Sequence, residues 1–336
     1  MTTQPTLRRD VVVFGASAGG LQALRQIVER LPRDLPASIL VAVHLSPTAP
    51  SRLPRMLQDA GSLPAVAAHD GQRVLPSTIH TVVPDRHLLV TEGDRLLLSR
   101  GPRENRVRPS VDKSFRSVAR WCGPRAIGVM LSGTLDDGAS GFASIARCGG
   151  VPLVQSPEEA RFDGMPRAAL AAVPGATALP VAQLAKTITE LAGQEVAPLV
   201  DGLDEDLIWE TDMAERGGSG ADQAGDPVGL GCPECGGGMN RVRAVGSTHY
   251  VCHAGHSYAP QTLLAAKEEG IESALWTALS ALQEKSMVLF DLAHRAAEAG
   301  DEAGRRGHEA AAARAAHAVD LLREQILLED DSALGA

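Results

Sequence analysis

Val11-Val12-Val13-Phe14-Gly15-Ala16-Ser17-Ala18-Gly19-Gly20 is the stretch that decides the fold of this chain. The four apolar residues predict a buried strand, and after the glycine-rich turn Leu21, Leu24 and Val28 recur at helical spacing. A strand that turns sharply into a helix is typical of a parallel α/β sheet. Ser17 would then lie at the carboxyl edge of the sheet, beside helix N–H groups that can bind an oxyanion. Serine is also a common helix N-cap, so this turn alone is weak evidence for a nucleophile.

Two further apolar runs end in residues of complementary chemistry. The run at 39–43 is followed directly by His44, and the run at 126–131 leads through a small-residue loop to Asp137. Active sites of doubly wound sheets gather at the carboxyl ends of the strands. A serine, a histidine and an aspartate at three such ends indicate a nucleophile, a base and an orienting carboxylate. The order Ser, His, Asp along the chain differs from that of the α/β-hydrolases.

The pattern of strands and helices continues to about residue 195. Apolar runs at 78–83, 87–90 and 95–98 predict a hairpin excursion on the sheet, because Glu92-Gly93-Asp94 is a turn signal. A short strand at 151–154 and a helix at 181–191 complete the unit.

Several of these stretches together resemble the catalytic domain of the CheB-like protein-glutamate methylesterases of bacterial chemotaxis. The matching segments, in the order of that family and within residues 8–195, are 15–20, the strand ending in His44, 83–87, 108–112, 133–141 and 164–167. The resemblance implies a Rossmann-like doubly wound, mostly parallel sheet with Ser17 as nucleophile, His44 as base and Asp137 as third member. Asp136 is the alternative to Asp137. Arg108, Asp112 and Arg167 could hold substrate or form ion pairs between segments.

The resemblance also implies an activity. We expect a serine-dependent carboxyl ester hydrolase that removes methyl esters from glutamate side chains of a chemotaxis-type or related signalling protein, with glutamine deamidation as a further activity and no cofactor for catalysis. Ala18 stands where the family often has threonine, and 133–135 reads Gly-Thr-Leu where it often has Gly-Met-Gly. These departures motivate the alternative of a catalytically attenuated signalling scaffold or binding protein on the same fold.

A mononucleotide-binding protein is disfavoured, because the turn lacks both the G-x-G-x-x-G spacing and a Walker lysine. The first strand begins by about residue 10, so we expect no receiver domain before it.

A cysteine cluster follows in the last third of the chain. Cys232-Pro233-Glu234-Cys235 is followed by three glycines and then by Cys252 and His256. This spacing is close to that of a zinc ribbon, so Cys232, Cys235, Cys252 and His256 are predicted to hold one structural zinc ion. His249 and His253 are the alternative fourth ligands.

Four segments are therefore expected: the methylesterase-like domain at 8–195, an acidic Gly-rich linker at 196–228, the zinc-ribbon module at 229–259, and helices at 260–330. The linker is predicted to be mostly disordered, since it is acidic with few apolar anchors. In the last segment, apolar positions at helical spacing predict a helical hairpin or a pair of helices that forms a homodimer.

Composition excludes several classes of protein. The 336 residues carry a formal net charge of −9, which argues against a nucleic-acid partner. No apolar run approaches the ~18 residues of a membrane helix, and residues 1–9 lack the apolar centre of a signal peptide. Three of the five cysteines cluster at one site, which fits a reducing compartment. We therefore expect a cytoplasmic protein without membrane insertion.

Overall fold

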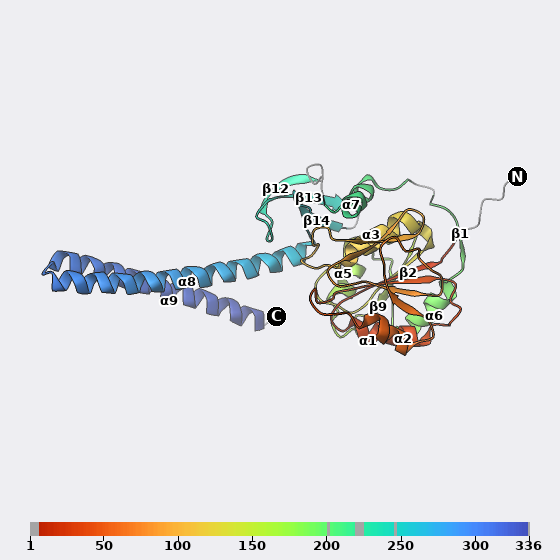
Figure 1. Cartoon of the computed structure of the whole chain (residues 1–336), viewed down its shortest axis with the longest axis horizontal. Coiled ribbons are helices and arrows are strands. Elements are labelled where there is room, and N and C mark those ends of the chain that lie inside the picture. Colours follow the sequence, from red (N-terminus) through yellow and green to blue (C-terminus); the bar gives the residue numbers. More distant parts are fainter. Residues whose placement is uncertain (1–6, 200–201, 219–224, 245–246, 335–336) are drawn as a thin grey trace. The chain divides into compact units, whose positions relative to one another are not determined.

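A seven-stranded sheet forms the centre of the computed structural model, which describes residues 7–199, 202–218, 225–244 and 247–334 (Figure 1). Every neighbouring pair in the sheet is parallel, and the strand order is β10-β9-β8-β2-β3-β5-β4. The strands are β2 (Val11–Ala16), β3 (Ser38–Val43), β4 (Ala65–Ala67), β5 (Ile79–Thr81), β8 (Ala126–Met130), β9 (Val151–Gln155) and β10 (Thr177–Leu179).

Helices cover both faces of this sheet. One face carries α1 (Gly20–Arg30), α2 (Leu53–Ala60) and α6 (Val181–Leu191), and the other carries α3 (Val111–Cys122), α4 (Ala139–Arg147) and α5 (Gly164–Ala172) (Figure 1). All residues of β2 and β3 are buried, which is why these strands read as continuous apolar runs rather than alternating ones.

The strand order reverses at β2, because β3 lies on one side of it and β8 on the other. The loops after β2, β3 and β8 therefore meet at the carboxyl edge of the sheet, at the switch point of a doubly wound fold. The predicted fold class is confirmed. Of the three runs expected in the hairpin, two form it as β6 (His87–Thr91) and β7 (Arg95–Ser99), which pair with each other. The run at 78–83 instead supplies β5 of the large sheet, parallel to β3 and β4. The remaining short pair is β1 (Leu7–Arg8) with β11 (Glu195–Val196).

The cysteine-rich segment forms a second, antiparallel sheet, which we call the ribbon. Its strands are β12 (Asp226–Gly231), β13 (Gly238–Ala244), β14 (Ser247–Cys252) and β15 (Ser257–Tyr258). The ribbon belongs to the same compact unit as the large sheet, which extends to Leu263.

The segment at 196–228 differs from the disordered linker that we expected, because residues Glu205–Glu215 form helix α7. Leu207 is buried in the main core, while Met213 packs against Val242 and Val251 of the ribbon. Most acidic side chains of this helix and its N-cap bind residues of α3 and α4: Arg116–Glu210 (3.6 Å), Arg120–Asp212 (2.6 Å), Arg147–Asp204 (3.2 Å) and Trp121–Glu215 (2.9 Å). These acidic side chains therefore pair with buried and half-buried groups of the main domain instead of solvating a tether. Residues 200–201 and 219–224 of the segment lie outside the described residues.

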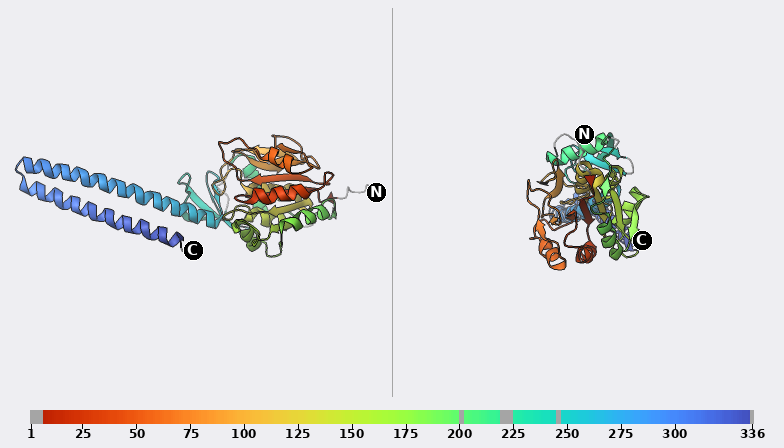
Figure 2. Two further views of the ribbon diagram at one scale, coloured as in Figure 1. Left: turned by 90° about the horizontal axis from the view of Figure 1, so that it is seen from below. Right: turned by 90° about the vertical axis from the view of Figure 1, so that its right-hand side faces the viewer.

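Residues 264–336 form the second compact unit. Helix α8 (Pro260–Glu298) begins in the first unit and continues into the second, where α9 (Glu302–Leu334) returns beside it as a hairpin (Figure 2). Leu279, Val319 and Ile326 form the centre of their contact. The predicted helical hairpin is present, and dimerisation through it remains a prediction. No helix in the described part of the chain is both long enough and apolar enough to span a membrane.

Candidate active site and metal site

Ser17, His44 and Asp137 lie together at the carboxyl edge of the large sheet. Ser17 follows β2, His44 follows β3, and Asp137 lies in the loop between β8 and α4, two residues before the helix. The His44 Nδ1 atom is 2.8 Å from the Ser17 Oγ atom, and the His44 Nε2 atom is 2.7 Å from the Asp137 Oδ2 atom. The His44 side chain is 21% exposed and that of Asp137 is 3% exposed, so the row runs from the surface into the protein.

The Asp137 carboxylate accepts hydrogen bonds from several directions. Its Oδ1 atom accepts from the Ser110 hydroxyl (2.9 Å) and the Asn105 side-chain amide (2.8 Å), and its Oδ2 atom accepts from the Val111 N–H (2.8 Å). Val111 is the first residue of α3, where a helix N-terminus favours negative charge. Burial alone would raise the pKa of Asp137, but the contact with His44 and these donors outweigh burial and lower the pKa.

The ionised carboxylate decides the tautomer of His44. A carboxylate only accepts hydrogen bonds, so Nε2 must carry the proton that is donated to Asp137. The Nδ1 atom then has a free lone pair, which accepts the hydrogen of the Ser17 hydroxyl. This arrangement leaves His44 ready to take a proton from Ser17.

The neighbouring Asp136 points elsewhere. Its Oδ1 atom accepts from the Thr262 hydroxyl (2.7 Å) and its Oδ2 atom from the Gln261 N–H (3.1 Å), both in the first turn of α8. Burial raises the pKa of Asp136 despite these donors. Of the two aspartates considered from the sequence, Asp137 is therefore the one that forms a hydrogen bond with His44.

The loop after β8 packs closely against Ser17. The N–H of Gly133 donates to the Phe162 carbonyl (3.0 Å), and its own carbonyl accepts from the Met165 N–H (2.9 Å). A Cβ atom at Gly133 would collide with the Met165 sulfur and would lie 2.9 Å from the Ser17 Cβ atom. Only glycine at this position allows the loop to approach the serine so closely.

An apolar hollow of about 310 Å³ lies between α1, the loop after His44 and α2. It is lined by Leu21 of α1, by Leu45 directly after His44, and by Leu53 and Met56 of α2.

The arginines considered as substrate ligands take part in ion pairs. Arg108 lies 2.7 Å from Asp85, and Arg100 and Arg108 together lower the pKa of Asp85 to about 2. Arg167 pairs with Asp163 on the surface. Asp112 accepts from the Gly141 N–H (2.7 Å) and from Asn105 (3.1 Å), both inside the protein.

The four predicted metal ligands converge in the ribbon. One ligand atom from each of Cys232, Cys235, Cys252 and His256 lies within 4.8 Å of the others. The Cys235 and Cys252 sulfurs are 3.7 Å apart, and the Cys252 sulfur is 3.6 Å from the His256 Nδ1 atom. A tetrahedron with Zn–S bonds of about 2.3 Å has edges of about 3.8 Å, so the donor set fits zinc.

A carboxylate outside the cluster orients the histidine ligand. The His256 Nε2 atom is 3.3 Å from Glu234, which also accepts from the Tyr258 hydroxyl (3.4 Å). Such a partner holds a metal-ligating imidazole in the tautomer that frees the other nitrogen. Of the alternatives, His249 instead contacts Glu210 of α7 (2.5 Å), and His253 packs over Gly237.

Sequence reasoning missed two residues that hold the carboxylate. Ser110 lies in a segment of the resemblance, but as the residue before α3 it was not distinguished from an ordinary helix cap. Asn105 is held by contacts with residues 137 and 259, and no sequence pattern relates these positions.

Comparison with known proteins agrees with this architecture. The family model described as CheB methylesterase matches residues 12–188. A protein-glutamate methylesterase/protein-glutamine glutaminase from Anaeromyxobacter dehalogenans is 42% identical over 166 residues, which are 49% of this chain and 48% of the relative. One from Symbiobacterium thermophilum is 35% identical over 188 residues, 56% of this chain and 52% of the relative.

The crystal structure of the CheB methylesterase catalytic domain of Thermotoga maritima superposes with a TM-score of 0.53 at 28% identity. The superposition covers 55% of this chain and 100% of the solved domain. The chain belongs to the CheB methylesterase family. It spans about half the length of the curated relatives that it matches.

Proposed function

We propose that this protein hydrolyses methyl esters of glutamate side chains in a methylated receptor or related signalling protein, and that it also deamidates glutamine. The observation that carries the proposal is the hydrogen-bonded row of Ser17, His44 and Asp137 in a chain of this family. The names of the curated relatives include both activities.

In the proposed reaction, the His44 Nδ1 atom takes the proton of Ser17 as the Oγ atom attacks the ester carbonyl. Asp137 stabilises the imidazolium that forms and keeps its Nε2 atom directed inward. N–H groups at the start of α1, around Ala18 and Gly19, bind the oxyanion, with the loop around Thr134. His44 returns its proton to the methoxy group, methanol leaves, and water then hydrolyses the acyl-enzyme. With glutamine, ammonia leaves in the same step.

The ribbon would hold one zinc ion through Cys232, Cys235, Cys252 and His256. Four protein ligands leave no open coordination position, so the ion would contribute folding energy rather than chemistry. Thiolate ligands need a reducing compartment, which supports a cytoplasmic location.

Hydrolysis of a γ-methyl glutamate peptide and labelling by a fluorophosphonate test the proposal. The Ser17→Ala variant should lose on the order of 10⁴-fold in hydrolysis and all labelling, because the three residues act as a unit. Ser62→Ala is the matched control, since this serine is exposed on the loop before β4, at the opposite edge of the sheet. A wild-type chain that is neither labelled nor active would instead support the attenuated scaffold.

A further inference from the structure

Asn105 lies in a tight turn that the proposed mechanism does not use. Asn105 and Arg106 both have positive φ values, 52° and 65°, and the turn closes by two hydrogen bonds between Glu104 and Val107. Asparagine enters this left-handed region more readily than most residues. The Asn105 side chain is buried inside the protein, with 5% of the residue exposed.

All hydrogen-bonding groups of the Asn105 side chain have partners. The Nδ2 atom donates to Asp137 Oδ1 (2.8 Å) and to Asp112 Oδ2 (3.1 Å). The Oδ1 atom accepts from the Ala259 N–H (2.6 Å), which lies directly before α8. The reverse orientation of the amide would turn its oxygen toward two carboxylates and its donors toward an N–H. The contact with Ala259 therefore helps to keep both donors on the aspartates.

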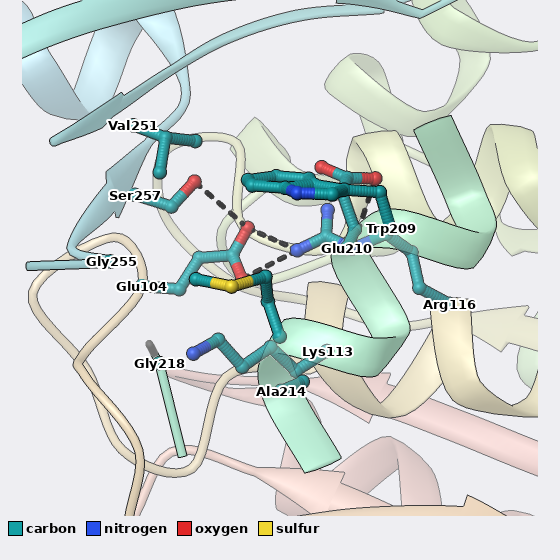
Figure 3. A pocket seen from close by; sticks show the side chains of 11 residues that line it. Glu104, Lys113, Arg116, Trp209, Glu210, Ala214, Gly218, Val251, Gly255 and Ser257 are labelled. Carbon is teal, nitrogen blue, oxygen red and sulfur yellow. Dashed lines mark hydrogen bonds and ion pairs between the residues drawn. The ribbon is translucent and has the colours of Figure 1, made fainter. Parts of the chain in front are cut away.

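Residues 257–262, which we call the junction, run from β15 into the first turn of α8 and hold this turn. The Asn105 N–H donates to the Ser257 carbonyl (2.7 Å), and the Ser257 N–H donates to the Arg103 carbonyl (3.3 Å). The Glu104 carboxylate accepts from Arg116 of α3 and from the Ser257 hydroxyl (3.4 Å), as Figure 3 shows. A cavity of about 30 Å³ lies between Glu104, α3, α7 and the ribbon.

A second contact joins the junction to the catalytic loop. Gln261 and Thr262 both donate to Asp136, the residue before Asp137. The first N–H groups of a helix have no partner within the helix, and Asp136 satisfies one of them at the start of α8. The junction thus contacts the loop of Asp137 directly through Asp136 and indirectly through Asn105.

We infer that Asn105 is a positioning residue for Asp137 and that the junction holds Asn105 in place, so that the ribbon completes the esterase site. This inference rests on the proposed function. It assigns the ribbon a part in catalysis although its metal takes no part in the chemistry. A displacement of Asp137 would be transmitted to Ser17 through His44, and a 1 Å misplacement can cost about 10²-fold in rate.

Two substitutions of Asn105 test the positioning role in the full chain. Asn105→Asp keeps the shape and the acceptor for Ala259 but turns a third carboxylate toward Asp112 and Asp137. Asn105→Gly removes the side chain in a residue that tolerates positive φ. We expect kcat for a small ester to fall about 10- to 100-fold in both, with KM unchanged, because Asn105 touches no substrate. Folded, zinc-loaded variants with wild-type kcat would overturn the inference. A purely structural role in docking the ribbon would spare Asn105→Asp.

Ala259→Pro tests whether the junction holds Asn105 in place. Proline has no N–H, so the hydrogen bond from residue 259 to the Asn105 Oδ1 atom is lost. We expect a several-fold loss of kcat with the zinc content retained. Gln261→Ala is the matched control, since it alters the junction but keeps the N–H that binds Asp136. Wild-type kcat in Ala259→Pro would show that the ribbon does not support Asn105.

The downfield NMR signal of the His44 Nε2 proton reports the hydrogen bond to Asp137 without requiring that the protein be active. It therefore tests the role of Asn105 independently of the proposed function. A His44→Gln variant, which lacks the signal, assigns it. In Asn105→Asp the signal should shift or broaden, because the acceptor of this proton has moved. If the wild-type chain hydrolyses no ester, the proposed function fails while this measurement still decides the role of Asn105. An unchanged signal in Asn105→Asp would contradict the positioning role of Asn105.

Discussion

The large sheet and the ribbon are held together by different means. The sheet buries one continuous apolar core to which β2, β3, β8 and the flanking helices all contribute. In the ribbon, Val242 and Val251 pack against Met213 and Trp209 of α7, and Met239 and Tyr258 are buried as well. The apolar core of a small antiparallel sheet is smaller than that of the large sheet, so a crosslink would add to its stability, and the cysteine–histidine cluster can provide one.

The two regions therefore need different interactions in order to fold. Apolar burial supports the sheet, whose three carboxyl-edge loops then bring Ser17, His44 and Asp137 together. The ribbon contacts α7 and the turn around Asn105, and we expect it to depend also on a metal ion held by the cysteine–histidine cluster. Conditions that remove the metal should therefore affect the two regions unequally.

Removal of zinc is expected to have the largest effect. Structural zinc contributes about 10–16 kcal/mol in zinc-finger peptides, which is comparable to the stability of a whole domain. In Cys235→Ser, the amides of β12–β15 should lose hydrogen-exchange protection while those of β2, β3 and β8 keep theirs. Metal analysis should find one zinc per wild-type chain. Absence of zinc from freshly purified, reduced protein, or loss of protection in both sheets, would contradict the comparison.

Substitution of Asp137 by asparagine should come next. The side-chain amide that Asp137→Asn introduces would donate to the His44 Nε2 atom, so Nδ1 would carry the proton and could not accept from Ser17. We expect kcat to fall about 10⁴-fold, close to 5.5 kcal/mol, with little change in zinc content. Asp136→Asn is the matched control, because it keeps an oxygen for Gln261 and should cost far less. Equal losses at both positions would disprove the distinction between them.

The smallest effect is expected in the helical hairpin, which forms its own compact unit. Leu279 is 5% exposed and packs against α9, so Leu279→Ala should destabilise the hairpin by about 2–4 kcal/mol. Leu321 is 53% exposed, and Leu321→Ala should cost less than about 0.5 kcal/mol. Hydrogen exchange of α8 and α9 measures both. Turnover of a small ester should not change, and a change would link the hairpin core to the active site.

The parts of the fold that follow local patterns could be predicted. Continuous apolar runs ending in a glycine-rich turn, in His44 and in the loop to Asp137 indicated a parallel sheet with these residues at one edge. The spacing of Cys232, Cys235, Cys252 and His256 likewise indicated a cluster. Helix α7 could not be predicted in this way, because its acidic residues are explained only by the arginines of α3 and α4 that they meet.

The sequence by itself determined the order of the elements, because hydrophobic periodicity and turn residues act over a few neighbouring positions. It also determined which side chains lie at the ends of strands. The resemblance favoured Asp137 over Asp136, but only the tertiary structure decided that Asp137 faces His44 while Asp136 turns to α8. The role of Asn105 between Asp137 and Ala259 depends on contacts that span 32 and 154 positions. Such contacts form only when separate elements are packed together.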